Sequence, residues 1–121
     1  MNLKSESIDP IPMFTKKGLL EHLGEIERRL YMPKVTREIK KQPEEVRIDF
    51  VATRLALTAI IRRLKTARMR EIREKLDQQT PELKKGILDL GESLKNIENA
   101  SRWAGAINGI IKIISRIIEI F

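Results

Sequence analysis

The last third of the chain carries the clearest hydrophobic pattern. Apolar and small residues recur there at alternating steps of four and three, at Leu83, Ile87, Leu90, Leu94, Ile97, Ser101 and Ala104. This spacing predicts an amphipathic helix and is typical of a coiled-coil seam. Thr80 suits the N-cap, Pro81 the first helical position and Glu82 the first turn, so we expect this helix to span about residues 80–121.

A second long helical pattern precedes it. Pro43, followed by Glu44 and Glu45, predicts a helix start, and nothing interrupts the pattern until residue 77. Its expected buried stripe is Val46, Phe50, Leu57, Ile60, Ile61, Leu64, Ala67, Ile72 and Leu76. The short connection at residues 77–80 allows only an antiparallel turn. We therefore predict a long antiparallel hairpin of residues 44–77 and 80–121.

The first third of the chain predicts one shorter helix. Thr15 is a suitable N-cap, Pro33 a suitable end, and Leu19, Leu20, Leu23, Ile26 and Leu30 fall on one stripe between them. Residues 33–43 are expected to form a linker, in which Val35 and Ile39 fit a single helical turn. Residues 1–14, with two prolines, are expected to form an irregular arm.

These patterns together predict an all-α protein with one helical-bundle domain at residues 15–121. No segment shows the sustained alternation of apolar and polar residues that strands require. A long hairpin with a single lateral helix leaves much of its apolar seam uncovered. We therefore expect self-association to complete the bundle.

The isoleucine-rich end has an unusually wide apolar arc. Its residues, which we call the isoleucine face, are Trp103, Ile107, Ile110, Ile111, Ile114, Ile117, Ile118 and Phe121. One interpretation is a helix at the centre of a bundle. The other is an oligomer or membrane face, in which an amphipathic helix enters the interface with Trp103 as its anchor. Lys112, Arg116 and Glu119 make a permanent membrane span costly.

Positive charge is concentrated in the middle of the chain. The net charge is +7, and residues 47–75 hold nine basic and three acidic residues. On one continuous helix Arg62, Arg63, Lys65, Arg70 and Arg73 would form a basic ridge. The ridge is either a solvated helix face or a contact surface for phosphates of nucleic acid or lipid. Without a helix-turn-helix or an aromatic platform, nucleic-acid binding would be independent of sequence.

The residues that usually carry catalysis are scarce. The chain has no cysteine and one histidine, His22, which lacks the Glu-x-x-His spacing of di-iron bundles. No serine lies in a nucleophile motif, and no glycine-rich loop follows a strand. We therefore expect no enzymatic activity, no metal and no cofactor. The N-terminal residues do not form a secretory signal, so residence in the cytoplasm is the default expectation. Peripheral membrane contact is the expectation only under the membrane interpretation of the isoleucine face.

The sequence favours a non-enzymatic helical interaction or oligomerisation module. Its expected partner is a second copy or another helical protein, and the isoleucine face would add contact with an anionic membrane surface. The alternative is sequence-independent nucleic-acid binding through the basic ridge.

Overall fold

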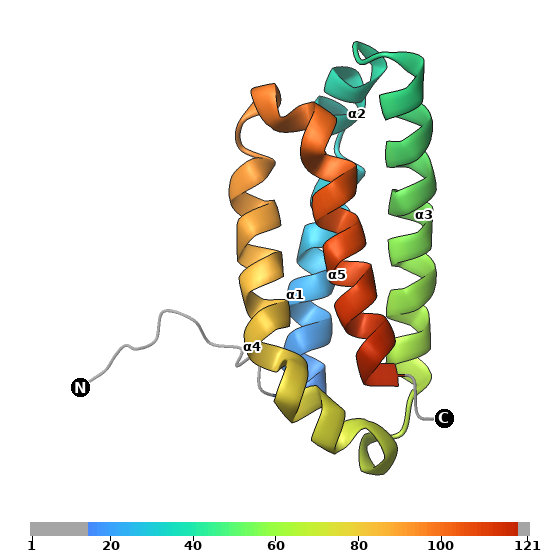
Figure 1. Cartoon of the computed structure of the whole chain (residues 1–121), viewed down its shortest axis with the longest axis vertical. Helices are drawn as coiled ribbons and strands as arrows, with labels where there is room; N and C mark the ends of the chain where they lie inside the picture. The colour runs from blue at the N-terminus through green and yellow to red at the C-terminus, as the bar shows by residue number, and fades with distance from the viewer. Residues whose placement is uncertain (1–14, 119–121) are drawn as a thin grey trace, which may run out of the picture.

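The structure, a computed structural model, describes residues 15–118 (Figure 1). These residues form α-helices and one 3-10 helix, with no strand among them, so the all-α prediction is confirmed. In chain order the elements are α1 (Lys16–Leu30), α2 (Pro33–Lys40), α3 (Glu44–Thr66), α4 (Met69–Ser93), η1 (Ile97–Arg102) and α5 (Trp103–Ile118).

The four longer helices, α1, α3, α4 and α5, pack side by side along one axis (Figure 1). Both α1 and α5 pack against α3 and α4, which places α1 and α5 at opposite corners of the bundle. The α1 and α4 helices run in one direction, and α3 and α5 run in the other. The short elements α2 and η1 contact each other at one end of the bundle.

The predicted hairpin is wrong in its position and in its pairing. Residues 77–80 lie inside α4, and Pro81 is an interior residue of that helix rather than its first. Figure 1 shows α4 changing direction near its middle, as a proline kink does. The α3 helix, which should have paired antiparallel with the C-terminal helix, runs in the same direction as α5.

The α4 helix continues through Pro81 because its buried stripe does. Leu76 and Leu83 are both fully buried on the same side of α4, one on each side of the proline in sequence. An interior proline costs about 3 kcal/mol, whereas each buried Leu or Ile contributes about 1.5–3 kcal/mol. The hydroxyl of Thr80 donates to the Leu76 carbonyl at 2.5 Å and does not cap a helix start. The stripe is Ile72, Leu76, Thr80, Leu83, Ile87 and Leu90.

The actual helix breaks lie at two other places. Ala67 and Arg68 both have extended backbone angles, which end α3 and begin α4. After α4 the chain turns again at Asn96, whose side-chain oxygen accepts from the Glu98 amide at 3.0 Å and caps η1. The sequence predicted one long helix from about residue 80. In the structure, the described residues of that segment belong to the second half of α4, to η1 and to α5.

The predicted start of the first helix agrees with the structure. The hydroxyl of Thr15 accepts from the Gly18 amide at 2.9 Å, so α1 starts where the sequence indicated. The expected linker instead contains α2, which begins with Pro33 and buries Val35 and Ile39 against the body. The expected arm, residues 1–14, lies outside the described residues.

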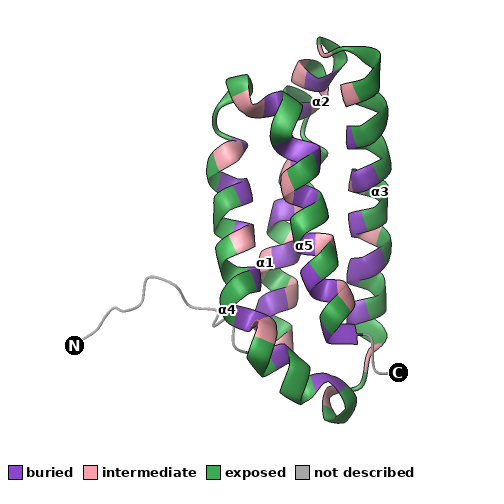
Figure 2. Cartoon of the chain, in the orientation of Figure 1, coloured by how far each residue is buried: buried purple, intermediate pink, exposed green. Residues whose placement is uncertain are grey.

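The bundle covers its own apolar core. Trp103 and Phe50 meet with ring centroids 6.1 Å apart, and the indole nitrogen of Trp103 donates to the Ser93 carbonyl at 3.0 Å. Figure 2 shows buried positions on the inward sides of α3 and α4, and buried residues also recur along α1 and α5. The uncovered seam that predicted self-association is therefore not present in the described residues, and any such contact must use another surface.

Glycine substitutions test the packing of α5. A Cβ added at Gly109 would meet nothing within 4 Å, because the position is exposed in mid-helix. We expect Gly109→Ala to raise the free energy of unfolding by about 0.5–1 kcal/mol in urea denaturation. Gly91→Ala is the matched comparison in α4. Its Cβ would lie 3.2 Å from an Arg29 guanidinium nitrogen, so its gain should be smaller or reversed. Equal gains at both positions would contradict the packing described.

Candidate interaction surface

The isoleucine face lies in the core. Trp103 is 1% exposed, and Ile107, Ile110, Ile114 and Ile117 are fully buried. Ile118 is also buried, Ile111 is partly buried against the core, and Phe121 lies outside the described residues. The wide apolar arc fits a helix flanked by two others, which is the bundle-centre interpretation. As folded here, this face is not available to a membrane or to a partner.

None of the helices within residues 15–118 is long and apolar enough to cross a membrane. Within the same residues no three His, Cys, Asp or Glu side chains gather closely enough to hold a metal ion.

The basic ridge does not exist as one helix face. Arg62, Arg63 and Lys65 lie in the last two turns of α3, whereas Arg70 and Arg73 lie in the first turns of α4. The break at residues 67–68 separates the two groups, so the prediction that they share a helix face is wrong. All five side chains are exposed near the α3–α4 turn. No carboxylate of residues 15–118 forms an ion pair with any of them.

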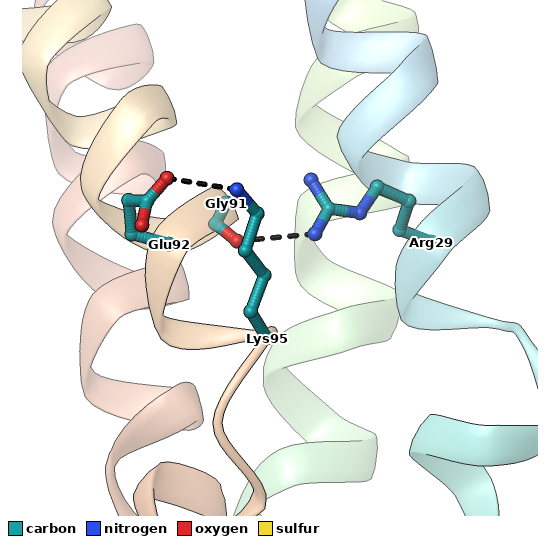
Figure 3. Close-up of polar contacts among 4 residues, drawn as sticks. All are labelled: Arg29, Gly91, Glu92 and Lys95. Carbon is teal, nitrogen blue, oxygen red and sulfur yellow. Dashed lines mark hydrogen bonds and ion pairs between the residues drawn. The ribbon is translucent and has the colours of Figure 1, made fainter.

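Several other cations hold helix ends together. Lys16 donates to the Lys65 carbonyl at 2.9 Å and to the Ala67 carbonyl, at the C-terminus of α3. Arg29 of α1 donates to the Gly91 carbonyl at 3.0 Å, near the end of α4, beside the Lys95–Glu92 ion pair (Figure 3). Such contacts place a positive charge at the negative end of a helix dipole and satisfy its terminal carbonyls.

Arg54 makes the same kind of contact at the end of α1. It donates to the Leu30 carbonyl at 3.1 Å, and its guanidinium lies 4.3 Å from the Tyr31 ring centroid and 5.3 Å from that of Phe50. Part of the positive charge therefore serves the packing of the helices and does not mark a binding surface.

The clearest unoccupied apolar surface is on the outer side of α3. Ile48, Val51 and Leu55 are 62%, 41% and 59% exposed, and Ala52 and Ala59 are also exposed. At 100° per residue these five residues, which we call the α3 strip, lie within about 100° of one another. The buried residues Phe50, Leu57 and Leu64 lie on the opposite side. Figure 2 shows α3 at one edge of the bundle, with buried positions inward and exposed positions outward.

The α3 strip differs from the other exposed apolar residues. Seven large hydrophobic side chains are exposed in the described residues, and three of them lie in this one row. Tyr31 contacts Arg54, and Met32, Leu88 and Ile97 lie on other segments. A shallow depression follows the first half of the strip, lined by Glu44, Arg47, Ile48, Val51, Ala52 and Leu55. Contiguous apolar surface of this kind is typical of a protein contact.

The two ends of the α3 strip carry opposite charge. Glu44 and Glu45 lie in the first turn of α3, and Arg62 and Arg63 lie near its end. On the helical wheel, each pair falls within about 60° of the centre line of the strip. All four side chains are exposed. The surface is therefore an apolar row with an acidic end and a basic end.

Sequence reasoning missed this strip although its signal was present. The steps from Ile48 to Val51, Ala52, Leu55 and Ala59 are three, four, seven and eleven, the spacing of one helix face. The inward stripe of α3 has the same period and larger side chains, and it accounted for the helix by itself. Packing against the core requires only one apolar side of α3, so the core does not account for a second apolar row on the opposite side.

No protein family matches this chain, and no curated protein and no solved structure is significantly similar to it. Its function must therefore be argued from the surface itself.

Aspartate substitutions separate the core from the strip. Ile114→Asp would bury a carboxylate without a partner in the centre of the bundle, so we expect loss of cooperative folding. Leu55→Asp adds a charge at a position already 59% exposed, and we expect its thermal midpoint to remain within a few degrees of the wild type. Circular dichroism of both variants in dilute solution measures this. A folded Ile114→Asp protein would mean that α5 does not pack as described.

Proposed function

We propose that this protein is a non-enzymatic helical interaction module that binds an apolar protein helix along the α3 strip. The observation that carries the proposal is the outward apolar row on a helix whose opposite side already fills the core. Leucine, isoleucine and valine at helical spacing recognise a partner helix by mutual burial.

The energetics indicate what the partner must supply. Completing the burial of Ile48, Val51 and Leu55 contributes about 3 kcal/mol, since each is already about half buried. Association costs about 4–15 kcal/mol in lost freedom of movement. The partner must therefore bring a comparable apolar row and must also satisfy the charged ends. A polar surface or a single loop would not be enough.

The non-enzymatic part of the proposal rests on the sequence. The chain offers no cysteine and a single histidine, and its serines lie outside recognisable nucleophile motifs. We assign no membrane role to the isoleucine face, because α5 would first have to leave the core. That step would expose Trp103 and at least six isoleucines.

A paired substitution tests the module. We expect Ile48→Asp/Leu55→Asp to abolish complexes of the chain, because two carboxylates would interrupt the strip. Leu88→Asp/Ile97→Asp is the matched control, since those side chains are similarly exposed, at 55% and 46%, but lie on α4 and η1. The measurement is the apparent mass of the tagged chain, both purified and in cell extract. The wild type and the control should form complexes that the strip variant does not.

Two results would contradict the proposal. One is a wild-type chain that migrates at its own mass of 14.0 kDa in both settings. The other is a complex that the strip substitutions and the control substitutions weaken equally.

A second candidate is sequence-independent nucleic-acid binding near the α3–α4 turn. It is favoured by the five exposed cations that have no acidic partner in the described residues. If all five contact phosphates of a duplex, raising salt from 50 to 200 mM should weaken binding by about three orders of magnitude. Neutralising Arg62, Arg63, Arg70 and Arg73 to glutamine should remove it, as measured by fluorescence anisotropy with two unrelated duplexes. Binding that survives salt, or that prefers one duplex, would contradict this candidate.

A further inference from the structure

We propose that the helix received by the α3 strip is the α3 strip of a second copy of this chain, bound antiparallel. The two-fold axis would pass at the level of residues 53 and 54. This inference rests on the proposed function, because it names the partner of that same surface.

Charge is the first argument for an antiparallel second copy. At 100° per residue Glu44 and Arg62 lie on one side of the strip's centre line, and Glu45 and Arg63 lie on the other. An antiparallel two-fold pair brings residues of the same side together, so Glu44 of one chain lies beside Arg62 of the other, and Glu45 beside Arg63. Symmetry repeats both pairs at the other end, so the acidic end of each strip meets the basic end of its partner. These residues are exposed and make no ion pair within residues 15–118, which leaves them available to a partner. Complementary ends of this kind set the orientation of a helix pair more than its affinity.

Side-chain size is the second argument. The same axis places Ile48 opposite Ala59 of the partner, and Leu55 opposite Ala52. Each central layer then joins one large aliphatic side chain to one alanine, so ridges on one helix enter spaces on the other. This match occurs in the register that the charges select, and it involves different residues. A surface that complements itself in this way is what a two-fold dimer requires.

A parallel pair satisfies neither condition. In register, it would place glutamate against glutamate at one end and arginine against arginine at the other. It would also stack Ile48 on Ile48 and alanine on alanine, leaving layers of unequal width. Like charges held together at an interface oppose association. The sequence of α3 therefore favours one orientation.

The contact is long enough for a weak but specific dimer. From Glu44 to Arg63 the helix extends about 30 Å at 1.5 Å per residue. One helix pair of that length buries on the order of 1,000 Å² in total, at the lower limit of specific interfaces. We therefore expect an equilibrium between monomer and dimer in the micromolar range.

Cysteine crosslinking tests both partner and orientation, because the chain has no cysteine of its own. Ile48→Cys and Ala59→Cys change exposed positions and should fold normally. In the antiparallel pair, residue 48 faces residue 59 of the partner, whereas two copies of residue 48 lie about 16 Å apart along the axis. A disulfide needs Cα atoms within about 7 Å. Mixing the two purified variants under mild oxidation should therefore give at least about tenfold more dimer than either variant alone. Adding Leu55→Asp to both should remove the product.

Charge reversal provides a second measurement on the full chain. Glu44→Arg/Glu45→Arg alone, and Arg62→Glu/Arg63→Glu alone, should each weaken the dimer by about tenfold or more at low salt. Mixing the two variants should restore it, since opposite charges meet again at both ends. Restoration requires both variants to be folded, so a folding defect cannot produce it.

The outcomes separate this inference from the proposed function. Crosslinks as strong in the single variants as in the mixture would overturn the antiparallel orientation. A purified wild type that stays monomeric at high micromolar concentration would overturn the second copy. If strip-dependent complexes then appeared only in cell extract, the interaction module would remain and its partner would be a different protein. If no strip-dependent complex formed anywhere, both proposals would fall.

Discussion

The width of the apolar arc on α5 is the constraint on which the rest of the structure depends. The isoleucines of α5 span about 160° of its circumference at 100° per residue, which is more than one neighbouring helix covers, so α5 needs two neighbours. The α3 and α4 helices supply them, one on each side, and α1 closes the opposite corner. The other side of α5 remains outside, with Asn108 and Lys112 exposed and Arg116 paired with Glu82 at 3.3 Å. The arc that resembled a surface for lipid is thus the centre of the molecule.

Covering that arc shapes the other helices in different ways. The α4 helix changes direction near its middle, where Pro81 lies in sequence, and keeps its buried row on both sides of that point. Cations then join the helix ends to each other: Lys16 holds α3, Arg29 holds α4, and Arg54 holds α1. Part of the chain's positive charge therefore serves the packing of the helices, but the side chains of the basic ridge make none of these contacts. The α3 helix fills the core with one side and keeps a second apolar row outside, which the fold itself does not use.

The sequence predicted helix formation more reliably than helix ends. Helical periodicity and Thr15 identified the class and the start of α1, because both depend on local geometry. Pro81 was misread because the same residue suits a helix start and a kink, and only the burial of Leu76 and Leu83 on one side decides between them. Ala67 and Arg68 carry no breaking signal of their own. The α3 strip was visible in its spacing, but which side of α3 faces outward depends on where α5 packs, and periodicity does not reveal that.

Hydrogen exchange of α5 in a chain prevented from associating tests the central claim most directly. The measurement uses the Ile48→Asp/Leu55→Asp variant in dilute solution and follows the backbone amides of residues 107–117 by mass spectrometry. If α5 is the core of a single chain, these amides should be among the slowest to exchange and should open only with global unfolding. Rapid exchange of α5 in that monomer would show that its isoleucines need another molecule to cover them, and would contradict the structure described.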